Sequence, residues 1–363
     1  MKNKGIIRVA MAVTNDLETD RRVARHAAAL HEAGYEVTVV GRLLEESHPI
    51  DCAWHTHRMQ LRHRSGWRFY AEYNRRLLSW LLHEHNDIVW ANDTDTLPAS
   101  WLAARLTGAR LVMDAHELFP EVPELQGRQR VKRVWTAIER RLMPRCDAHL
   151  TVCQSIADYY KQLYGIEMTV VRNLNADTQA RGAVAAAEPP VLLYQGAVNE
   201  GRGVDWAIDA MGLLPECRLV VAGGGDKLEE MRRYAQAKEW NDRIEFVGRL
   251  LPDELAQLTR RASVGLVMLE DKGLSYHFAL PNRVGDFVAA GVPMVVSDLP
   301  EMAAVVRRFG VGAVIEQPGA EGLTKAVRQV MERKWSEADF AEARADMDWN
   351  KEKKKLLTIT EKL

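Results

Sequence analysis

Cysteine is scarce in this chain, and long apolar runs are missing from it. The four cysteines form no CxxC pair and have no histidine at a matching spacing, which argues against a zinc motif and a disulfide framework. Reduced thiols indicate a cytoplasmic protein. Nowhere do 18 apolar residues run together, and the apolar stretch near the N-terminus is too short for a signal peptide. We therefore expect a protein that is neither secreted nor membrane-spanning.

The chain also has no large excess of positive or negative charge. The formal net charge is −1 at pH 7, which argues against a dedicated nucleic-acid-binding protein. Apolar residues, by contrast, are plentiful, at 47% of 363 residues. A chain of this length is too long for one ordinary α/β core and suits two domains.

The first half alternates apolar strands with amphipathic helices. A strand over residues 6–13, a helix over 20–33 and a strand over 35–41 form an opening βαβ unit. This pattern predicts a doubly wound parallel sheet, whose ligands meet the carboxyl ends of the strands. Further strands are expected at residues 87–91, 110–114, 148–152 and 168–171. The polar segments at the ends of these strands are candidate ligand-binding segments: Asn15-Asp16, Asn92-Asp93 and Asp114-Ala115-His116-Glu117.

A change of composition separates the two halves. Residues 176–190 are rich in Ala, Gly and Pro and poor in large apolar side chains, which predicts an interdomain linker between domains 1–175 and 191–345. Residues 346–363 predict a polar C-terminal helix. A second βα series is expected, with strands at residues 191–194, 218–222, 243–247, 264–268, 292–296 and 312–315.

One stretch near the C-terminus, residues 275–302, combines a loop, a helix and a buried strand. Residues 280–282 can open the helix. Because the first turn of a helix presents unsatisfied N–H groups and partial positive charge, Arg283 and these amides suit a phosphate or diphosphate. Asp286 lies one turn further along, on the same side. We interpret the stretch as a binding site for an anion and a ribose.

A glycine-rich loop over residues 194–203, with one arginine, Arg202, follows the first strand of the second half and opens a helix. A plain turn with a solvated arginine is the alternative interpretation. The glycine cluster at residues 223–226 lacks the GxGxxG spacing of a dinucleotide site and is typical of a tight strand-to-helix turn.

Residues 191–211 and 275–302 resemble the retaining glycosyltransferases of family 4 (group 1), and weaker similarity runs over nearly the whole chain. The resemblance implies the GT-B fold, in which two Rossmann-like doubly wound domains face each other across a cleft and the C-terminal helix crosses back to the first domain. It also implies that a nucleotide-diphosphate sugar, of UDP or GDP type, binds the second domain and an acceptor the first. No other cofactor is expected.

The resemblance assigns roles to individual residues. Arg202 and Arg283 would neutralise the donor diphosphate, and Asp286 would hold the nucleotide ribose. His116 would reach the transferred sugar; a structural histidine is the alternative. The other donor-side positions are Gly196, Gly201, Gly203, Gly224, Val247, Gly248, Leu280, Pro281 and Asn282. The acceptor-side candidates are Asn15, Asp16, Asp93 and Glu117.

Two positions depart from the family pattern. The first of the family's usual pair of glutamates would stand at position 278, where this chain has Phe278. The family also often has a basic residue just after the first glycine of the loop, where this chain has Ala197. The glutamate's part in holding the sugar hydroxyls must therefore be performed differently here, and Arg202 and Arg283 are left to carry the phosphate charge.

The sequence Asp93-Thr94-Asp95 spells DxD, which binds a divalent metal in another class of glycosyltransferase. Here Asp95 suits the N-cap of a helix with Pro98 in its first turn, and no further cluster of oxygen ligands is evident. We therefore expect metal-independent chemistry.

Two segments combine many basic side chains with apolar ones. Residues 62–76 hold five Arg and one Glu among aromatic side chains, and residues 128–145 hold seven basic residues and one acidic one around an apolar stripe. These segments are either core helices with solvated faces or surfaces that dock on anionic lipid. Docking would place the protein at the inner face of the cell membrane.

The resemblance implies a retaining hexosyltransferase-type enzyme (EC 2.4 class). It would move a sugar from a nucleotide-diphosphate sugar to a glycan or lipid-linked acceptor in surface polysaccharide or glycoconjugate synthesis. Two alternatives stay open. One is an epimerase of GT-B fold that acts on a nucleotide sugar, and the other is a nucleotide-sugar-binding protein that has lost catalysis.

Overall fold

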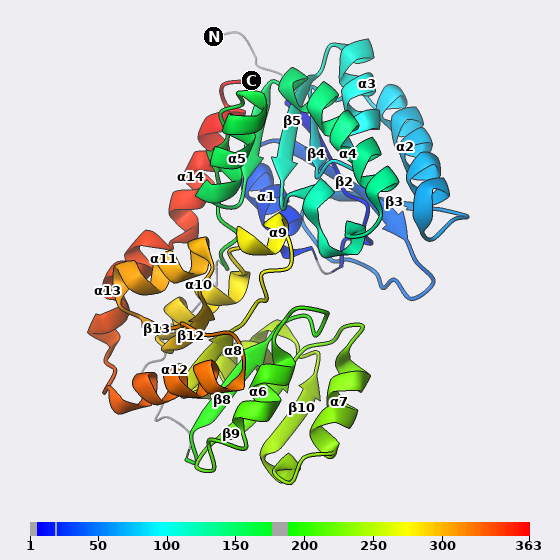
Figure 1. The fold of residues 1–363 in the computed structure, drawn as a ribbon. Coiled ribbons are helices and arrows are strands. Elements are labelled where there is room, and N and C mark those ends of the chain that lie inside the picture. Colours follow the sequence, from blue (N-terminus) through cyan, green and yellow to red (C-terminus); the bar gives the residue numbers. More distant parts are fainter. Residues whose placement is uncertain (1–5, 19, 176–187) are drawn as a thin grey trace. The chain divides into compact units, whose positions relative to one another are not determined.

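The computed structural model describes residues 6–18, 20–175 and 188–363, and these divide into two compact units (Figure 1). The first unit comprises Met1–Asn173 and Asn350–Leu363, and the second comprises Leu174–Trp349. Most of the predicted linker, residues 176–190, lies outside the described residues.

The first unit is built on a parallel sheet of seven strands in the order β3-β2-β1-β4-β5-β6-β7. Its central strands are buried on both faces, as the near-continuous apolar runs in the sequence predict. The order reverses between β1 and β4, so the polypeptide leaves the sheet in opposite directions at these two carboxyl ends. The strands are β1 Arg8–Ala12, β2 Glu36–Leu43, β3 His55–Gln60, β4 Ile88–Asn92, β5 Arg110–Ala115, β6 Ala148–Thr151 and β7 Thr169–Val170.

Helices connect these strands, and local sequence sets their ends. Asp20 caps the first helix by accepting a hydrogen bond from the backbone N–H of Val23, and Gly34 follows its last turn in a left-handed conformation. The helices are α1 Arg21–Glu32, α2 Gly66–His83, α3 Leu97–Thr107, α4 Gln129–Leu142, α5 Gln154–Tyr164 and α14 Trp349–Thr360, with short 3-10 helices η1 Phe119–Glu121, η2 Pro123–Leu125 and η3 Met143–Arg145.

Two features of this unit differ from the sequence-based expectation. Strand β3 was not predicted, because its sequence HTHRMQ is polar and the strand lies half-exposed at the edge of the sheet. The predicted helix cap at Asp95 is wrong, since Thr96 occupies the N-cap position of α3. The Asp95 carboxylate instead accepts a hydrogen bond of 2.7 Å from the Thr14 hydroxyl, and its carbonyl accepts one of 2.8 Å from Asn74.

The C-terminal residues from Asn350 onward belong to the first unit. Within α14, Glu352 is fully buried and accepts hydrogen bonds from the backbone N–H and the guanidinium of Arg172, which follows β7. Lys355 donates to the carbonyl of Val170 at 3.2 Å. A buried charge of this kind fixes where the helix packs, since an unpaired carboxylate there would be costly.

The second unit is built on a parallel sheet of six strands in the order β10-β9-β8-β11-β12-β13. The order reverses between β8 and β11. The strands are β8 Val191–Gln195, β9 Arg218–Ala222, β10 Ile244–Gly248, β11 Val264–Val267, β12 Met294–Ser297 and β13 Gly312–Ile315. The helices are α6 Val204–Ala210, α7 Leu228–Gln236, α8 Pro252–Arg261, α9 Leu274–His277, α10 Asn282–Ala290, α11 Pro300–Phe309, α12 Ala320–Glu332 and α13 Ala341–Asp346, with 3-10 helices η4 Asn241–Arg243 and η5 Glu337–Phe340.

Apolar side chains fill both faces of this second sheet. One core cluster surrounds Tyr194 and Leu219, and the other surrounds Phe287 on α10 and Met294 on β12. The Phe287 ring lies against Gly265 of β11, where a Cβ atom would come within 2.6 Å of it. This close packing fixes α10 against the sheet and so fixes where its N-terminus lies.

Among the residues that the structure describes, no helix is both long and apolar enough to cross a membrane.

Candidate active site

The predicted anion-binding site at the start of α10 lies where the strand order of the second sheet reverses. Arg283, in the first turn of α10, donates from Nη1 to the carbonyl of Gln195 at 2.8 Å and from Nη2 to the carbonyl of Met268 at 3.2 Å. These carbonyls stand at the carboxyl ends of β8 and β11, the two strands between which open α/β sheets bind ligands. The guanidinium therefore joins the two strand ends.

The environment of Arg283 is apolar and cationic. Its guanidinium carbon lies 4.7 Å from the centre of the Tyr194 ring, and 6% of the residue is exposed. Burial lowers the pKa of the guanidinium, and the neighbouring Arg202 adds to the effect. The buried Nε of Arg283 has no hydrogen-bond partner among the described residues. A cation that is buried without a carboxylate beside it favours an anionic ligand.

Glycines bring three strand ends of this sheet close together. The N–H of Gly196 donates to the carbonyl of Ala222, and that of Gly223 donates to the carbonyl of Gly248 at 2.7 Å. A Cβ atom on Gly223 would stand 1.8 Å from the Gly196 oxygen, and one on Gly196 would stand 3.0 Å from Arg283 Nη1. Only glycine permits this approach of backbone to backbone beside the guanidinium.

Arg202 stands in the loop between β8 and α6. Its guanidinium carbon lies 4.8 Å from the centre of the Tyr276 ring, and its buried Nε has no hydrogen-bond partner among the described residues. Gly201 and Gly203 flank it with φ angles of 73° and 65°, a conformation that side chains disfavour. Stacking on tyrosine holds the charge in place without neutralising it.

Asp286 faces the same strand end one turn into α10. Its Oδ2 accepts a hydrogen bond of 3.0 Å from the side-chain amide of Gln195, and its Oδ1 accepts one from Asn175. The carbonyl of the Gln195 side chain in turn lies 2.8 Å from the hydroxyl of Thr259. Sequence reasoning missed Gln195, Asn175 and Thr259, because only the tertiary fold brings β8, α8 and α10 together.

The other predicted donor-side residues border this strand edge. Gly224 lies in the turn after β9 and accepts a hydrogen bond from the N–H of Val198, and Val247 and Gly248 end β10. Leu280 and Pro281 precede α10, with Pro281 at its N-cap, and the exposed Asn282 is its first residue. The position of the missing glutamate, Phe278, is the C-cap of α9.

In the first unit, His116 lies between two carboxylates. Its Nδ1 is 3.4 Å from Asp93 Oδ2 and its Nε2 is 3.5 Å from Asp114 Oδ2. The backbone N–H of His116 also donates to Asp93 at 2.8 Å. Burial disfavours the charged ring, but the two carboxylates outweigh it and raise the pKa of His116 to about 9. His116 is therefore an imidazolium at neutral pH.

Asp114 is the anion that anchors this cluster. It is fully buried and accepts hydrogen bonds from Arg22 of 2.6 Å at Oδ1 and 3.1 Å at Oδ2, while His26 Nδ1 lies 3.2 Å from Oδ2. Burial alone raises the pKa of this carboxyl, but Arg22 and His116 hold it well below its usual range. Burial and Arg22 lower the pKa of His26 to about 4, so that ring is neutral.

Arg22 and His26 were not among the predicted site residues. They lie four residues apart on α1, on the face that also carries the buried Val23, Ala27 and Leu30. Polar residues at core positions of an amphipathic helix were the signal that could have found them.

The remaining acceptor-side candidates follow the same sheet edge. Asn15 donates to Asp20 and accepts from the N–H of Leu17, so its side chain shapes the loop after β1. Asp16 accepts from the N–H of Glu18, and Glu117 is exposed beside His116. The structure thus brings Asp93 and His116 into contact and places the other three along the edge.

Two more carboxyls are buried here, Asp95 of the DxD sequence and Glu139 on α4. Burial and the neighbouring Asp93 raise the pKa of Asp95 to about 7. Burial also raises the pKa of Glu139 to about 7, although Tyr160, Tyr164 and Thr94 donate hydrogen bonds to its carboxylate.

Over the described part of the chain, no group of three or more His, Cys, Asp and Glu side chains is arranged to hold a metal ion.

Comparison with known proteins places the chain in a class. The Glycosyltransferase Family 4 model matches residues 19–174, and the model named Glycosyl transferases group 1 matches residues 176–354. Glycogen synthase from Mycobacterium tuberculosis is 28% identical over an alignment of 230 residues, which covers 59% of this chain and 53% of that protein. The match thus spans about half the length of this curated relative.

Solved structures show the same fold at low sequence identity. Sucrose-phosphate synthase from Thermosynechococcus elongatus has a TM-score of 0.80 at 17% identity, over 98% of each chain. The lipopolysaccharide glycosyltransferase WaaG has a TM-score of 0.74 at 17% identity, over 97% of this chain and 99% of that one. HepE from Anabaena, in complex with UDP-glucose, has a TM-score of 0.75 at 12% identity, over 98% and 100%.

Two Rossmann-like parallel sheets, each with polar groups at the carboxyl ends of its central strands, define a protein of the GT-B fold class. The chain belongs to the group 1 (family 4 type) glycosyltransferases. The predicted family and fold class are confirmed, whereas the roles of the individual site residues stay predictions.

Proposed function

We propose that this glycosyltransferase transfers a sugar, with retention of anomeric configuration, from a nucleotide-diphosphate sugar bound by the second unit to an acceptor bound by the first. The buried guanidinium of Arg283 at the reversal point of the second sheet is the observation that carries the proposal. With Arg202 and the first-turn amides of α10, it offers positive charge where a leaving diphosphate needs it. Asp286 offers an acceptor for ribose hydroxyls.

The chemistry that these groups support is electrostatic. Negative charge develops on the diphosphate as the bond from its oxygen to the sugar breaks, and preformed donors stabilise that charge most when water is excluded. The acceptor hydroxyl attacks on the same face, and its proton passes to the departing phosphate oxygen. Neither a protein nucleophile nor a metal ion is needed in this scheme.

His116 enters the proposal as a fixed positive charge. Because Asp93 and Asp114 keep the ring protonated, it cannot accept a proton near neutral pH and so does not serve as a general base. Each ring nitrogen faces a carboxylate, so the imidazolium would act on the sugar or the phosphate through its positive charge.

The direct test of the proposal separates it from its alternatives. HepE was crystallised with UDP-glucose, so UDP-sugars are the first donors to try, followed by GDP-sugars. A ligand at 100 times its dissociation constant adds about 2.7 kcal/mol to stability, which a thermal-shift screen detects. The donor found is then incubated with and without a lipid-linked acceptor extract, and the products are analysed by mass spectrometry. Conversion of donor without acceptor would indicate an epimerase, and binding without conversion an inactive protein.

Asp286→Asn should raise the KM for the donor and change kcat little. A ribose contact is made in the ground state and the transition state alike, so its loss weakens binding in both. Asparagine also replaces one carboxylate oxygen by an NH₂ group that cannot accept from Gln195 or Asn175. Steady-state kinetics with varied donor check this, and Asp298→Asn on the exposed loop before α11 is the matched control. A fall in kcat at unchanged KM would remove the ribose assignment.

We also propose that the acceptor is a glycan or a lipid-linked glycan of a surface polysaccharide or glycoconjugate, and that the first unit docks on anionic lipid at the inner face of the cell membrane. Helix α4 supports the docking proposal. Its exposed face combines Arg130, Arg133 and Arg141 with Val131 and Val134, whose exposed fractions are 43% and 58%. Cations beside exposed aliphatic side chains suit a surface of anionic headgroups over acyl chains.

Charge reversal on α4 should release the protein from anionic vesicles. Each basic side chain near such a surface contributes about 1 kcal/mol, so Arg133→Glu and Arg141→Glu should each weaken binding by roughly fivefold or more. The attraction is screened beyond about 8 Å at physiological salt, so high salt should also release it. Co-sedimentation with phosphatidylglycerol and phosphatidylcholine vesicles measures this, with the exposed Lys334→Glu as control. Equal partitioning to both vesicles would point to a soluble acceptor instead.

A further inference from the structure

A pocket in the first unit lies at the carboxyl ends of β2 and β3. It has a volume of about 360 Å³ and is bounded by residues 42–47 on one side and residues 60–64 on the other. The N–H of Arg42 donates to the carbonyl of Asn15 at 2.8 Å, and the hydroxyl of Ser47 lies 3.5 Å from Asp16. The pocket therefore continues the sheet edge that carries the acceptor-side candidates.

Arg42 is the half-buried cation of this pocket. Its guanidinium carbon lies 4.9 Å from the centre of the Phe69 ring, and its Nη1 donates to the carbonyl of Arg64 at 3.2 Å. Among the residues that the structure describes, its buried Nε has no hydrogen-bond partner and no carboxylate forms an ion pair with this side chain. The guanidinium is thus held in place with donor capacity to spare.

The other ionisable groups around the pocket already have partners. Arg64 forms an ion pair with Glu45, whose side chain is 81% exposed, and Glu46 lies near the same guanidinium. His63 Nδ1 lies 2.9 Å from Glu72. These carboxylates pair with the neighbours of Arg42, and none of them forms an ion pair with Arg42 itself.

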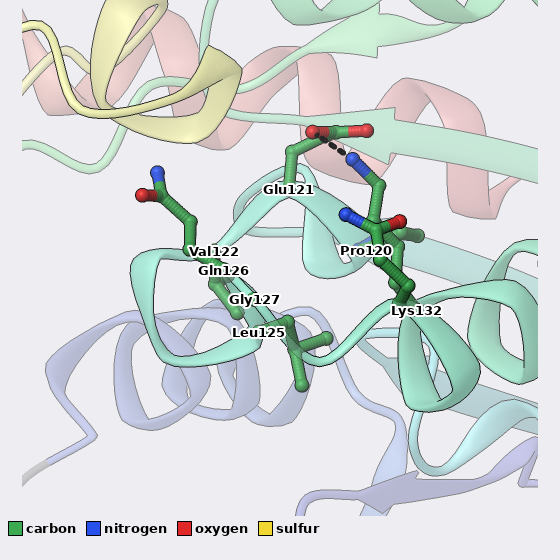
Figure 2. A pocket seen from close by; sticks show the side chains of 8 residues that line it. Pro120, Glu121, Val122, Leu125, Gln126, Gly127 and Lys132 are labelled. Atoms are coloured by element: carbon green, nitrogen blue, oxygen red, sulfur yellow. Dashed lines mark hydrogen bonds and ion pairs between the residues drawn. The ribbon is translucent and has the colours of Figure 1, made fainter.

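A different cavity of the same unit provides the contrast. Figure 2 shows it between η1 and the start of α4, with a volume of about 300 Å³. Its lining lysine, Lys132, bonds to Glu121 at 2.6 Å, so its positive charge is satisfied within the protein. The lysine of that cavity already has a carboxylate partner, whereas Arg42 could pair with an anion that enters its pocket.

We propose that the β2–β3 pocket binds a small anionic group, a phosphate or a carboxylate, through the guanidinium of Arg42. Arginine presents several N–H donors in a planar fork that matches such oxygens. The anion could be carried by the acceptor sugar or by a lipid headgroup, and the chemistry of recognition is the same. This inference rests on the proposed function only for the identity of the anion's carrier.

Inorganic phosphate is the probe for the site itself. Sodium phosphate is titrated into the full chain at constant ionic strength, and the ¹H–¹⁵N signals of the arginine Nε–H groups are followed. The Arg42 signal is assigned with Arg42→Lys, and the exposed Arg75 on α2 serves as the reference. A saturable shift at Arg42 without one at Arg75 supports the site. An Arg42 signal that does not move, or that drifts in parallel with Arg75, overturns it.

Kinetics and vesicle binding then identify the carrier. Monosaccharides are offered as acceptors in neutral and phosphorylated form, and Arg42→Gln should lower the preference for the phosphorylated form by roughly tenfold or more. Arg75→Gln should keep the wild-type preference. If Arg42→Gln instead loses binding to phosphatidylglycerol vesicles, the anion is a lipid headgroup. If the variant changes neither the preference nor vesicle binding, Arg42 only packs on Phe69 and the proposal fails.

The two proposals fail in different ways. If the wild-type protein transfers sugar from no donor, the proposed function is wrong, but a saturable phosphate shift at Arg42 still establishes the anion site. If transfer occurs and phosphate leaves Arg42 unchanged, the glycosyltransferase proposal stands without this pocket.

Discussion

Arg283→Ala should lower kcat/KM for the donor by roughly 10- to 150-fold. Hydrogen bonds to charged groups contribute about 1.5–3 kcal/mol, and here the group lost would stabilise a charge that grows as the diphosphate leaves. The same variant should be less stable by about 1–3 kcal/mol, because the carbonyls of Gln195 and Met268 lose their donor in a buried place. Initial rates and thermal melts measure the two effects separately.

Comparison with two other variants separates electrostatics from packing. Arg283→Lys keeps a positive charge but cannot reach both carbonyls with one planar fork, so it should recover part of the activity and little of the stability. Arg307→Ala removes an exposed arginine of the same unit, 60% exposed and paired with Asp298, and should cost about 0–1 kcal/mol in stability with no loss of rate. An Arg283→Ala enzyme that melts early yet keeps full kcat/KM would make Arg283 a structural link between β8 and β11 and nothing more.

Sequence patterns predicted most of this fold because the sheets are parallel and buried. Strands covered by helices on both faces need continuous apolar runs, and such runs stand out between helices and glycine turns. Strand β3 was missed by the sequence analysis because an edge strand buries few side chains and its residues HTHRMQ show no apolar alternation. Helix α10 was found because residues 280–291 carry both of its ends, a proline before the first turn and a glycine after the last.

The candidate site was predictable only where it is local in sequence. Arg283 and Asp286 share one helix, so a single stretch indicated both. The partners of Arg283 lie 88 and 15 residues away in the chain, and only the adjacency of β8 and β11 brings them together. In the same way, Arg22 meets Asp114 across 92 residues. A pattern that spans such distances cannot be read from spacing, since the order of strands in the sheet decides it.

The DxD sequence shows how context changes a motif. Its Asp95 was expected to cap a helix, yet the carboxyl is turned inward to Thr14, and burial raises its pKa to about 7. Its Asp93 turns with a φ of 61° and faces His116 instead. Buried donors from other elements outweigh the local preference of aspartate for a helix start.

Asp114→Asn should be the most destabilising conservative change in the first unit, at about 3–5 kcal/mol. It leaves Arg22 and the imidazolium of His116 buried without their shared anion, and breaking a buried ion pair costs far more than losing an exposed one. Glu167→Gln, which alters an exposed pair with Lys161, is the matched control and should cost about 0–1 kcal/mol. Chemical denaturation of both variants at pH 7 measures the difference.

The pH dependence of the same variant tests the cause. The depressed pKa of Asp114 contributes stability that is present above the ordinary aspartate pKa of about 3.9 and is lost as the pH falls below it, so the wild type and Asp114→Asn should converge in acid. The raised pKa of His116 contributes stability that is present below about 6.5 and is lost as the pH rises through about 9. Removing the Asp114 charge should lower the pKa of His116, so this loss should move to lower pH. If the imidazolium takes part in transfer, kcat/KM should also fall as the ring loses its proton, and in the variant that fall should move to lower pH as well. If the alkaline limb of kcat/KM stays in place while stability falls, His116 holds the fold but takes no part in transfer.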